Sequence, residues 1–245
     1  MVVVSTNNKL TTQTAKVLLK KIRTNQQQVQ QKILNHPYLN GLEQGERADS
    51  VLRSFIGNQY HLMHSIVGAD AQMKKRFTNT ELANYFEQML RSELEASRAL
   101  LLLAQTLGMS EESLETYETE PDALAYGYYV SSLATNGSLA EIVASLGVNF
   151  PIWAGNCQRI SMVLRQLYGF NSSQTRFFDI FAEASSSIDD GPVIKAISLG
   201  LGAGVSEEKI ARSVRLIQGY ELRFWDAMAS TMDVDKSQSQ EVNDE

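Results

Sequence analysis

The sequence predicts an all-α protein folded as a single bundle of roughly eight helices. Three observations support this fold class. Apolar residues recur at three- and four-residue spacings along most of the 245 residues, no alternating run is long enough to form a convincing strand, and no linker divides the chain. Hydrophobic residues make up 43% and charged residues 20% of the chain, which is ordinary globular composition. We therefore expect one large helical core.

The ends of the chain are expected to lie outside the bundle. Residues 1–8 are predicted to be disordered or extended, residues 9–232 to form one helical domain, and residues 233–245 to form a disordered polar tail. The glutamine-rich segment 26–31 lies within the first helical pattern. It is interpreted as a solvated helix face rather than as a disordered low-complexity segment.

Turn and capping residues divide the first half of the domain into elements. A first helix over residues 9–34 should end at His36-Pro37, because proline disfavours helical geometry in the residue before it. A second helix is predicted over residues 46–71. Thr78 to Glu81 resembles a capping box, so a third helix should begin there and end at Gly108.

The next elements begin at serine or proline. Ser110, followed by two glutamates, should restart helix, and Pro121 should open a helix that ends at Asn136-Gly137. Ser138 is predicted to cap the next helix. Pro151 should either start or kink the helix that carries Trp153.

The C-terminal elements follow the same logic. Ser172 or Ser173 is predicted to cap a helix that carries three phenylalanines. A shorter, glycine-rich segment then spans residues 189–204. Its glycines follow no strand and no Gly-Lys-Ser/Thr ending is present, so they do not indicate a phosphate loop. Ser206, followed by two glutamates, should open a last long helix that runs to about Met232.

Charge and cysteine content narrow the function classes. The formal net charge is −6 and the isoelectric point is near 5.2, which argues against nucleic-acid binding and gives no sign of attraction to anionic membranes. Cys157 is the single cysteine, so no disulfide can form within the chain. No apolar run approaches the roughly 20 residues that span a bilayer, and residues 2–4 are too short for a signal-peptide core. We expect a cytoplasmic protein with no membrane partner.

The most informative segment for chemistry surrounds Glu221. Phe224 and Trp225 follow it by three and four residues, so the three side chains share one helix face. An acid beside two large aromatics lies either at the rim of a surface or in the wall of a pocket. Burial in a pocket would perturb its pKa and allow it to act as an acid or base.

Histidine and cysteine give weaker signals. His61 and His64 are three residues apart, a spacing at which imidazoles can share a metal, but two ligands do not make a site and no Glu-x-x-His pair exists in the chain. Cys157 has no neighbouring histidine in sequence, so a buried and unreactive thiol is the default interpretation.

Two aromatic clusters allow two interpretations each. Tyr126 and Tyr129 share a helix face, whereas Tyr128 points elsewhere, beside small serines that would leave room for a ligand. Phe177, Phe178 and Phe181 form the second cluster. Either cluster could pack in the core or form a wall that stacks a planar ligand, and Tyr128 and Phe181 are the ligand-wall candidates.

The order of several short motifs resembles one protein family. These motifs, which each are loose but together extend over residues 34–230, are His36-Pro37, Phe55-Ile56-Gly57-Asn58-Gln59-Tyr60, Gly137-Ser138-Leu139-Ala140-Glu141, Trp153 and Glu221-x-x-Phe224-Trp225-Asp226-Ala227. They resemble the TenA and PqqC group of heme-oxygenase-like helical bundles. The resemblance implies a central, aromatic-lined pocket for a small molecule and self-association into a homodimer or larger homo-oligomer.

The family's catalytic residues carry over only in part. The nucleophilic cysteine of TenA thiaminases falls near Asn149, and the family's aspartate falls at Gln59. The terminal glutamate is retained as Glu221. The resemblance therefore implies, if the chain is an enzyme, a cysteine-independent hydrolase of an aminopyrimidine, thiamin-related compound in which Glu221 transfers the proton.

A metal-dependent branch of the group is typified by the chlamydial death-domain-associating protein, CADD. The ligand positions of that branch fall on residues that cannot bind a metal, namely Leu90, Ser97, Phe181, Ser185 and Ile188. An alternative set would combine His61 and His64 with the carboxylates of Glu87, Glu93, Glu95 and Glu141. A CADD-like oxidase and a non-catalytic binding or interaction protein stay open as alternatives.

The combined hypothesis is a pocket for a small, planar, heteroaromatic molecule, with no cofactor and no metal. Glu221 is the expected catalytic residue. The expected ligand-binding residues are Gln59, Tyr60, Asn149, Trp153, Tyr128, Phe181 and Trp225.

Overall fold

The computed structural model describes residues 2–45, 48–185 and 189–241, and these ranges form helices joined by short turns, without a strand in the part described. The all-α prediction is confirmed. The helices are α1 (Val2–Leu34), α2 (Pro37–Glu43), α3 (Ala48–Arg76), α4 (Ala83–Thr106), α5 (Glu111–Glu115), α6 (Pro121–Asn136), α7 (Leu139–Leu167), α8 (Arg176–Ser185), α9 (Gly191–Gly202) and α10 (Glu207–Glu241).

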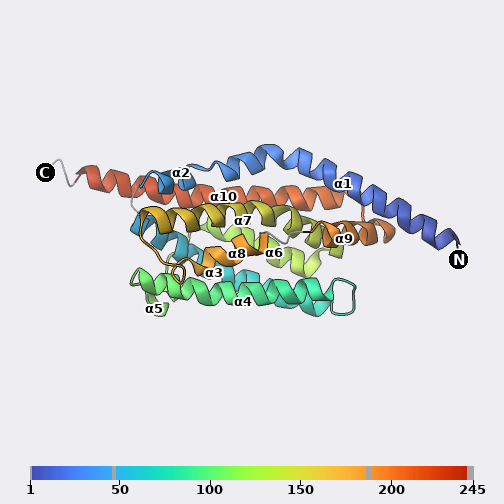
Figure 1. Ribbon diagram of the computed structural model, residues 1–245, viewed down its shortest axis with the longest axis horizontal. Coiled ribbons are helices and arrows are strands. Elements are labelled where there is room, and N and C mark those ends of the chain that lie inside the picture. Colours follow the sequence, from blue (N-terminus) through green and yellow to red (C-terminus); the bar gives the residue numbers. More distant parts are fainter. Residues whose placement is uncertain (1, 46–47, 186–188, 242–245) are drawn as a thin grey trace.

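The long helices lie along one common axis (Figure 1). Helix α7 runs through the middle of the bundle and packs against α8, α9 and α10. Helix α3 packs against α4 on one side and α6 on the other, and α4 also meets α8. Helix α1 covers α9 and α10. The inner faces of α3, α4, α6, α7, α8 and α10 therefore converge on one interior.

Both terminal helices extend beyond the predicted domain. α1 begins at Val2, where the sequence predicted a disordered or extended start, and α10 continues to Glu241, past the predicted end near Met232. The sequence contains no proline or glycine between Val2 and Leu34 or after Gly219, so nothing in the chain interrupts either helix. Residue 1 and residues 242–245 lie outside the described residues.

The break at His36-Pro37 is confirmed. Nδ1 of His36 accepts a hydrogen bond from the backbone N–H of Tyr38, which caps α2, and Pro37 occupies the first helical position. Nε2 of the same ring donates to Oδ1 of Asp226 at 3.1 Å. This side chain thus ties the start of α2 to α10.

Three predicted helix starts at serine are confirmed, including Ser206, which accepts a hydrogen bond from the backbone N–H of Lys209 at the start of α10, and two predicted caps are wrong. Ser110 caps α5, and Ser138 forms a full capping box with Glu141 at the start of α7. Helix α4, in contrast, begins at Ala83 without a side-chain cap, because Thr80 forms a local turn instead. Helix α8 begins at Arg176 rather than at Ser172 or Ser173, since the Asn171 carboxamide accepts the backbone N–H groups of the intervening turn.

Pro151 lies inside α7 and does not start it. The helix is already begun by the Ser138 capping box, and its buried face continues past the proline from Val148 and Asn149 to Ala154. Burial of that face outweighs the roughly 3 kcal/mol that an interior proline costs. Because proline has no N–H, the carbonyl of Gly147 lacks the helical donor that would come four residues later.

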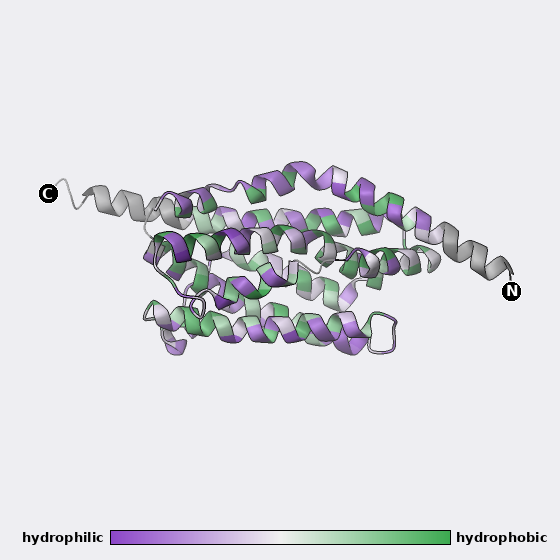
Figure 2. Cartoon of the chain, in the orientation of Figure 1, coloured by the Kyte–Doolittle hydropathy of each residue, from purple (hydrophilic) through white to green (hydrophobic). Residues whose placement is uncertain are grey.

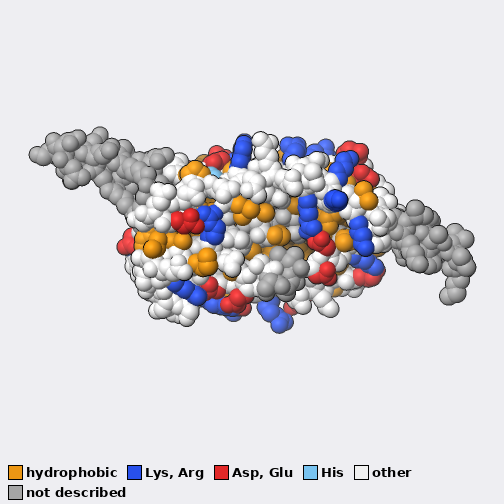
Figure 3. Space-filling view, turned by 45° about the horizontal axis from the view of Figure 1, so that its top comes forward, with side chains coloured by type: hydrophobic (Ala, Val, Ile, Leu, Met, Phe, Trp, Pro, Cys, Tyr) orange, Lys and Arg blue, Asp and Glu red, His pale blue; other side chains and the backbone are white. Residues whose placement is uncertain are grey.

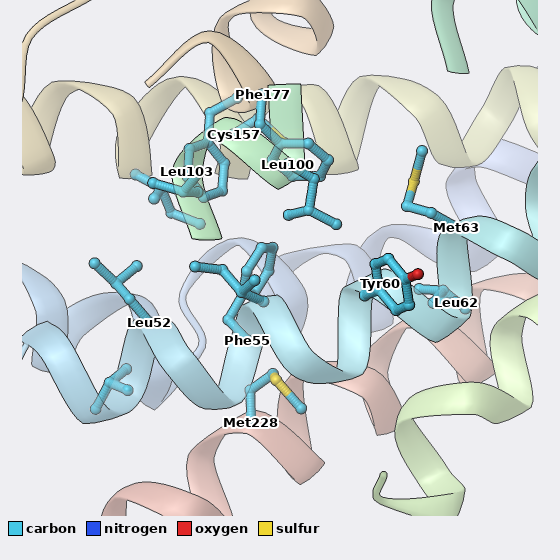
Figure 4. Packing of buried hydrophobic residues seen from close by; sticks show 14 of the residues in the cluster. Leu52, Phe55, Tyr60, Leu62, Met63, Leu100, Leu103, Cys157, Phe177 and Met228 are labelled. Atoms are coloured by element: carbon cyan, nitrogen blue, oxygen red, sulfur yellow. The ribbon is translucent and has the colours of Figure 1, made fainter. Parts of the chain in front are cut away.

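Aromatic and aliphatic side chains divide the interior into two neighbouring clusters. One surrounds Phe55 and includes Phe177, Phe224 and Trp225, and part of it appears in Figure 4. The other, around Phe86, joins α1, α3, α4, α6, α7, α9 and α10. Hydrophobic and hydrophilic residues alternate around each helix (Figure 2), as expected for amphipathic helices around a core.

The outer surface gives no strong charge signal on the face shown in Figure 3. Basic and acidic side chains are interspersed there. Among the described residues, charged side chains form ion pairs such as that of Lys195 with Glu81. No helix in the described part of the chain is both long and apolar enough to cross a membrane.

Candidate functional site

The converging helices enclose a cavity of about 430 Å³. That volume lies within the range of small-molecule sites in proteins. Its lining comes mainly from α3, α4, α6, α7, α8 and α10. The polar groups of the lining are Gln59, Asp70, Tyr85, Gln88, Ser92, Glu93, Tyr126, Asn149, Asp189 and Glu221.

Aromatic side chains form one wall of this cavity. The Trp153 ring meets Phe181 edge-on at 5.7 Å between ring centroids and Phe224 at 6.1 Å, and all three rings line the cavity. Phe150 meets Phe181 from the same wall. These rings offer apolar faces and edges to a planar ligand.

Glu221 is the buried acid beside this wall. It is 2% exposed, and its Oε1 accepts a hydrogen bond from Nε1 of Trp225 at 3.3 Å. Its Oε2 has no hydrogen-bond partner among the residues that the structure describes. Burial raises the pKa of Glu221 to about 7, although the Trp225 and Asn149 donors oppose the rise. A carboxyl group with such a pKa exchanges a proton readily near neutral pH.

Amide side chains surround the acid. Gln218 donates through Nε2 to Oδ1 of Asn149, and Asn149 donates through Nδ2 to the hydroxyl of Tyr126 at 3.2 Å. The Tyr126 hydroxyl keeps its own proton for donation, because burial raises its pKa well above the ordinary value. The chain of three side chains holds Asn149 and Tyr126 in fixed orientations at the cavity wall.

Two further acids line the same cavity, on α3 and α4. Asp70 is 2% exposed, and burial together with the Glu93 charge raises its pKa. Burial also raises the pKa of Glu93 to about 8. The Tyr85 hydroxyl lies nearby, and burial and then the Asp70 charge raise its pKa. At neutral pH the two carboxyl groups therefore retain at least part of a proton between them.

Five of the eight residues predicted for the site line this cavity, namely Gln59, Asn149, Trp153, Phe181 and Glu221. Trp225 does not line it. Its ring is fully buried behind Glu221, against Tyr38 and Phe55, and it reaches the site only through its hydrogen bond to Glu221.

Two predicted tyrosines face other surroundings. Tyr60 packs against the rings of His61 and His64, and its pKa is raised by burial and then by acids of α5, so it points away from the cavity. The placement of Tyr128 in the ligand wall is wrong, because its side chain is 59% exposed. On a helix, residues two apart face nearly opposite directions, and Tyr126 faces inward instead.

The sequence reasoning missed Asp70, Glu93, Tyr126 and Phe224 as lining residues. A usable signal existed for the two acids. Asp70 continues the stripe of Gln59, Met63 and Ile66 along α3, and an acid within an apolar stripe is rarely placed there for packing alone. Glu93 stands in the same relation to Met89 on α4.

Cys157 lies outside the cavity. Its side chain is fully buried in the Phe55 cluster together with Leu100, Leu103 and Phe177 (Figure 4), and burial raises the pKa of its thiol. A thiol of this kind is a poor nucleophile. The prediction of a buried cysteine is confirmed.

The described residues do not assemble a metal site. No group of three histidine, cysteine or acidic side chains lies close enough to hold a metal in the part of the chain described. The residues of the alternative ligand set have other partners. Nε2 of His61 donates to the Leu114 carbonyl, and His64 is exposed. Glu87 pairs with Lys74, Glu95 pairs with Arg176, and Glu141 accepts a hydrogen bond from Ser138. Only Glu93 of that set lines the cavity.

The positions expected from the CADD-like branch do not form a metal site either, among the residues that the structure describes. Phe181 is a wall of the cavity, Ser185 donates to the Ala182 carbonyl, and Ser97 donates to the Glu93 carbonyl. Ile188 lies outside the described residues. These side chains do not fit a metal.

Comparison with known proteins agrees with this architecture. Residues 23–232 match the model of the TENA/THI-4/PQQC family. A curated protein named aminopyrimidine aminohydrolase, from Halalkalibacterium halodurans, is 26% identical over 113 residues, which is 46% of this chain. The matched region spans half the length of that relative.

Solved structures show the same fold at low identity. A TenA homologue from Pyrococcus furiosus aligns with a TM-score of 0.65 at 17% identity, covering 86% of this chain and 99% of its own. A TenA homologue from P. horikoshii gives 0.68 at 17%, covering 87% and 99%. A domain from Shewanella denitrificans described as having a heme oxygenase-like fold gives 0.68 at 13%, covering 89% and 95%.

Proposed function

The chain belongs to the TENA/THI-4/PQQC family, and from this premise we propose that its cavity binds a small planar aminopyrimidine and hydrolyses it with Glu221 as the proton-transfer group. The observation that carries the proposal is the environment of Glu221. Its carboxyl group is buried beside an aromatic wall, has a pKa raised to about 7, and keeps Oε2 without a partner among the described residues. The name of the curated relative supports the same ligand class.

The cavity offers what an aminopyrimidine requires. The flat ring needs apolar faces, which Trp153, Phe181 and Phe224 supply. Its ring nitrogens and exocyclic amino group need both donors and acceptors. The amide of Gln59 offers both, and its Oε1 has no partner in the described part of the chain.

The proposed reaction uses water as the nucleophile. Glu221 in its ionised form takes a proton from the water, the hydroxide forms a bond to the carbon that bears the amine, and the carbon–nitrogen bond breaks. The proton then passes from Glu221 to the leaving nitrogen, which departs as ammonia. A group with a pKa near 7 suits both steps, because it accepts and releases a proton with little penalty. The buried thiol of Cys157 takes no part.

Substitution of two residues tests this assignment. Glu221→Gln should lower the rate of ammonia release from an aminomethyl-substituted aminopyrimidine by about 10²–10⁴-fold, the usual contribution of a general acid or base. Cys157→Ser should retain most of the activity. Glu208→Gln, an exposed acid on the same helix, is the matched control and should behave like the parent protein.

Binding and turnover must be measured separately. Calorimetric binding of the aminopyrimidine should persist in Glu221→Gln, because the wall and the amides remain. Unchanged turnover in this variant would remove Glu221 from the mechanism. Binding without turnover in the parent protein would instead support a non-catalytic binding protein.

A further inference from the structure

The acids that do not contact Glu221 form a second polar centre in the cavity. Asp70 lies on α3 and Glu93 on α4, and both line the cavity. The rings of Phe77 and Phe86 stack at 5.1 Å between centroids and so fix the register of this helical hairpin. Asp70 precedes Phe77 by seven residues and Glu93 follows Phe86 by seven residues. Each acid therefore lies about two helical turns from the stacked rings. The two carboxyl groups therefore face each other across the antiparallel pair.

The pair lacks the partners that other acids of these helices have. Glu87 pairs with Lys74 and Glu95 with Arg176 on the surface. Asp70 is only 2% exposed, and its Oδ2 has no hydrogen-bond partner among the described residues. The described lining contains no lysine, arginine or histidine. An ionised, buried Asp70 beside the partly buried Glu93 is costly unless something supplies a counter-charge.

The pair lies on other helices than the proton-transfer group, although the charges of all three acids act on Tyr126. Gln59 and Asp70 are eleven residues apart on the cavity face of α3, which corresponds to about 16 Å along the helix axis. Leu62, Met63 and Ile66 line the stretch between them. Along α3 the lining therefore passes from the amide of Gln59 through apolar side chains to Asp70, while the Tyr126 hydroxyl on α6 bonds to the Asn149 amide and lies within reach of the charges of Asp70 and Glu93.

The volume also exceeds the need of a single ring. At about 30 Å³ for each heavy atom, the share of a water molecule in the liquid, a cavity of about 430 Å³ has room for about 14 non-hydrogen atoms. A substituted pyrimidine ring alone would leave part of this volume unfilled. A ligand with a side arm would fill it.

We propose that the ligand carries a protonated aliphatic amine on an arm that extends from its ring, and that Asp70 and Glu93 bind this ammonium group. The inference rests on the proposed function, because the ring is taken to lie beside Glu221. Two carboxylates can accept several N–H bonds from one ammonium and supply its charge balance. The tyrosine hydroxyls of Tyr85 and Tyr126 flank the pair.

Binding of the cation should displace a proton. The titratable groups that line the same cavity are Tyr85 on α4, Tyr126 on α6, Glu221 on α10 and Asp189 before α9. Burial raises the pKa of both Asp70 and Glu93, so the empty pair holds a proton near neutral pH. A bound ammonium favours the ionised carboxyls and releases that proton to the buffer.

Two synthetic probes test the inference. Both contain a 4-aminopyrimidine ring with a four-carbon arm, which ends in an ammonium group in one probe and in a hydroxyl group in the other. Isothermal titration at pH 7.5 should show at least tenfold tighter binding of the ammonium probe by the parent protein. Titration in buffers of different ionisation enthalpy should show proton release for the ammonium probe alone.

Substitutions of the two acids test whether they cause the preference for the ammonium probe. Asp70→Asn and Glu93→Gln should each lose most of the tenfold preference while they retain the affinity for the hydroxyl probe. Glu87→Gln, an exposed acid on the same helix as Glu93, should keep the preference. If Asp70→Asn does not fold, as judged by circular dichroism, Glu93→Gln at the rim of the pair decides the point.

The two proposals can fail separately. Equal affinity for the two probes, or a preference that survives in both variants, would overturn the ammonium site and leave the proposed ring site intact. Failure of both probes to bind would overturn the proposed function and the ammonium site together.

Discussion

Nε1 of Trp225 donates a hydrogen bond to Oε1 of Glu221 across 3.3 Å, one helical turn along α10. The donor lies behind the acid, on the side away from the cavity, since Trp225 is fully buried and does not line it. The indole therefore orients the carboxyl group and moderates the rise in its pKa. The first two predictions follow from this contact and from the burial of the acid.

Trp225→Phe should raise the pKa of Glu221 further. The variant retains an aromatic ring but loses the N–H that favours the ionised form. The pH midpoint assigned to Glu221 in the rate profile of aminopyrimidine hydrolysis should move upward. Met228→Leu, which alters a buried side chain of the same helix outside the cavity lining without removing an N–H donor, serves as the control. A midpoint that is the same in Trp225→Phe and in the parent protein would contradict the role of the indole.

Stability should depend on pH through Glu221. Its pKa is raised from 4.5 to about 7 in the folded protein, so the folded state binds the proton more tightly than the unfolded state. The stabilisation is fully present below pH 4.5 and is lost as the pH rises through about 7, with a maximum effect of about 3 kcal/mol. Asp70 and Glu93 act in the same direction.

Glu221→Gln should remove the part of the pH dependence of stability that comes from Glu221. Urea denaturation at pH 5 and pH 8 should show a smaller loss of unfolding free energy in the variant than in the parent protein. The variant should consequently gain stability relative to the parent as the pH rises. Parallel pH dependences in the two proteins would show that the Glu221 proton is not linked to folding.

Asn149→Ala should break the chain of amides that orients the site. The Gln218 donor would lose its acceptor in a buried position, which costs about 1–3 kcal/mol in unfolding free energy. Gln72→Ala removes an exposed side-chain pair with Thr135 and should cost much less. Chemical denaturation measures both. Equal and small effects would indicate that water replaces Asn149 at no cost.

Two glycines of α7 provide a matched pair. A Cβ at Gly147 would overlap the Cγ2 atom of Val193 on α9, so Gly147→Ala should destabilise the protein by about 1–3 kcal/mol. A Cβ at Gly155 would meet only Leu34 Cδ2 at 3.5 Å, an ordinary contact. Gly155→Ala should therefore stabilise by up to about 1 kcal/mol through helix propensity.

The close contact itself can be tested by a second substitution. Val193→Ala creates space opposite residue 147, so the double variant should be more stable than the two separate changes predict. Thermal or urea denaturation of the four proteins gives the coupling. Strict additivity would show that Val193 does not limit the approach of α7 and α9.

The helices themselves were largely predictable from sequence, because their limits depend on local chemistry. Proline at 37 and 121 and serine at 110 and 138 act on neighbouring backbone groups, so their effects can be deduced from the sequence. Pro151 was ambiguous because its effect depends on how much surface the flanking turns bury. The start of α4 was mispredicted because Thr80 makes a turn before the helix begins.

The site was predictable only as far as helix periodicity and the family resemblance reach. Glu221, Gln59 and Asn149 were found through those signals. The error at Tyr128 arose from the choice between two faces of α6, which the sequence of α6 alone does not decide. The pairing of Asp70 with Glu93 depends on the register between α3 and α4, a tertiary property.

Pro151 gives the cavity wall a feature that no side chain supplies. Gly147 lines the cavity, and its carbonyl oxygen lacks the usual helical donor because residue 151 is an imino acid. The backbone of the cavity wall thus contains one acceptor that the usual donor four residues later does not satisfy. Substitutions of the amide and acid side chains in the cavity would leave this carbonyl oxygen unchanged. Only replacement of Pro151 would restore its usual helical donor.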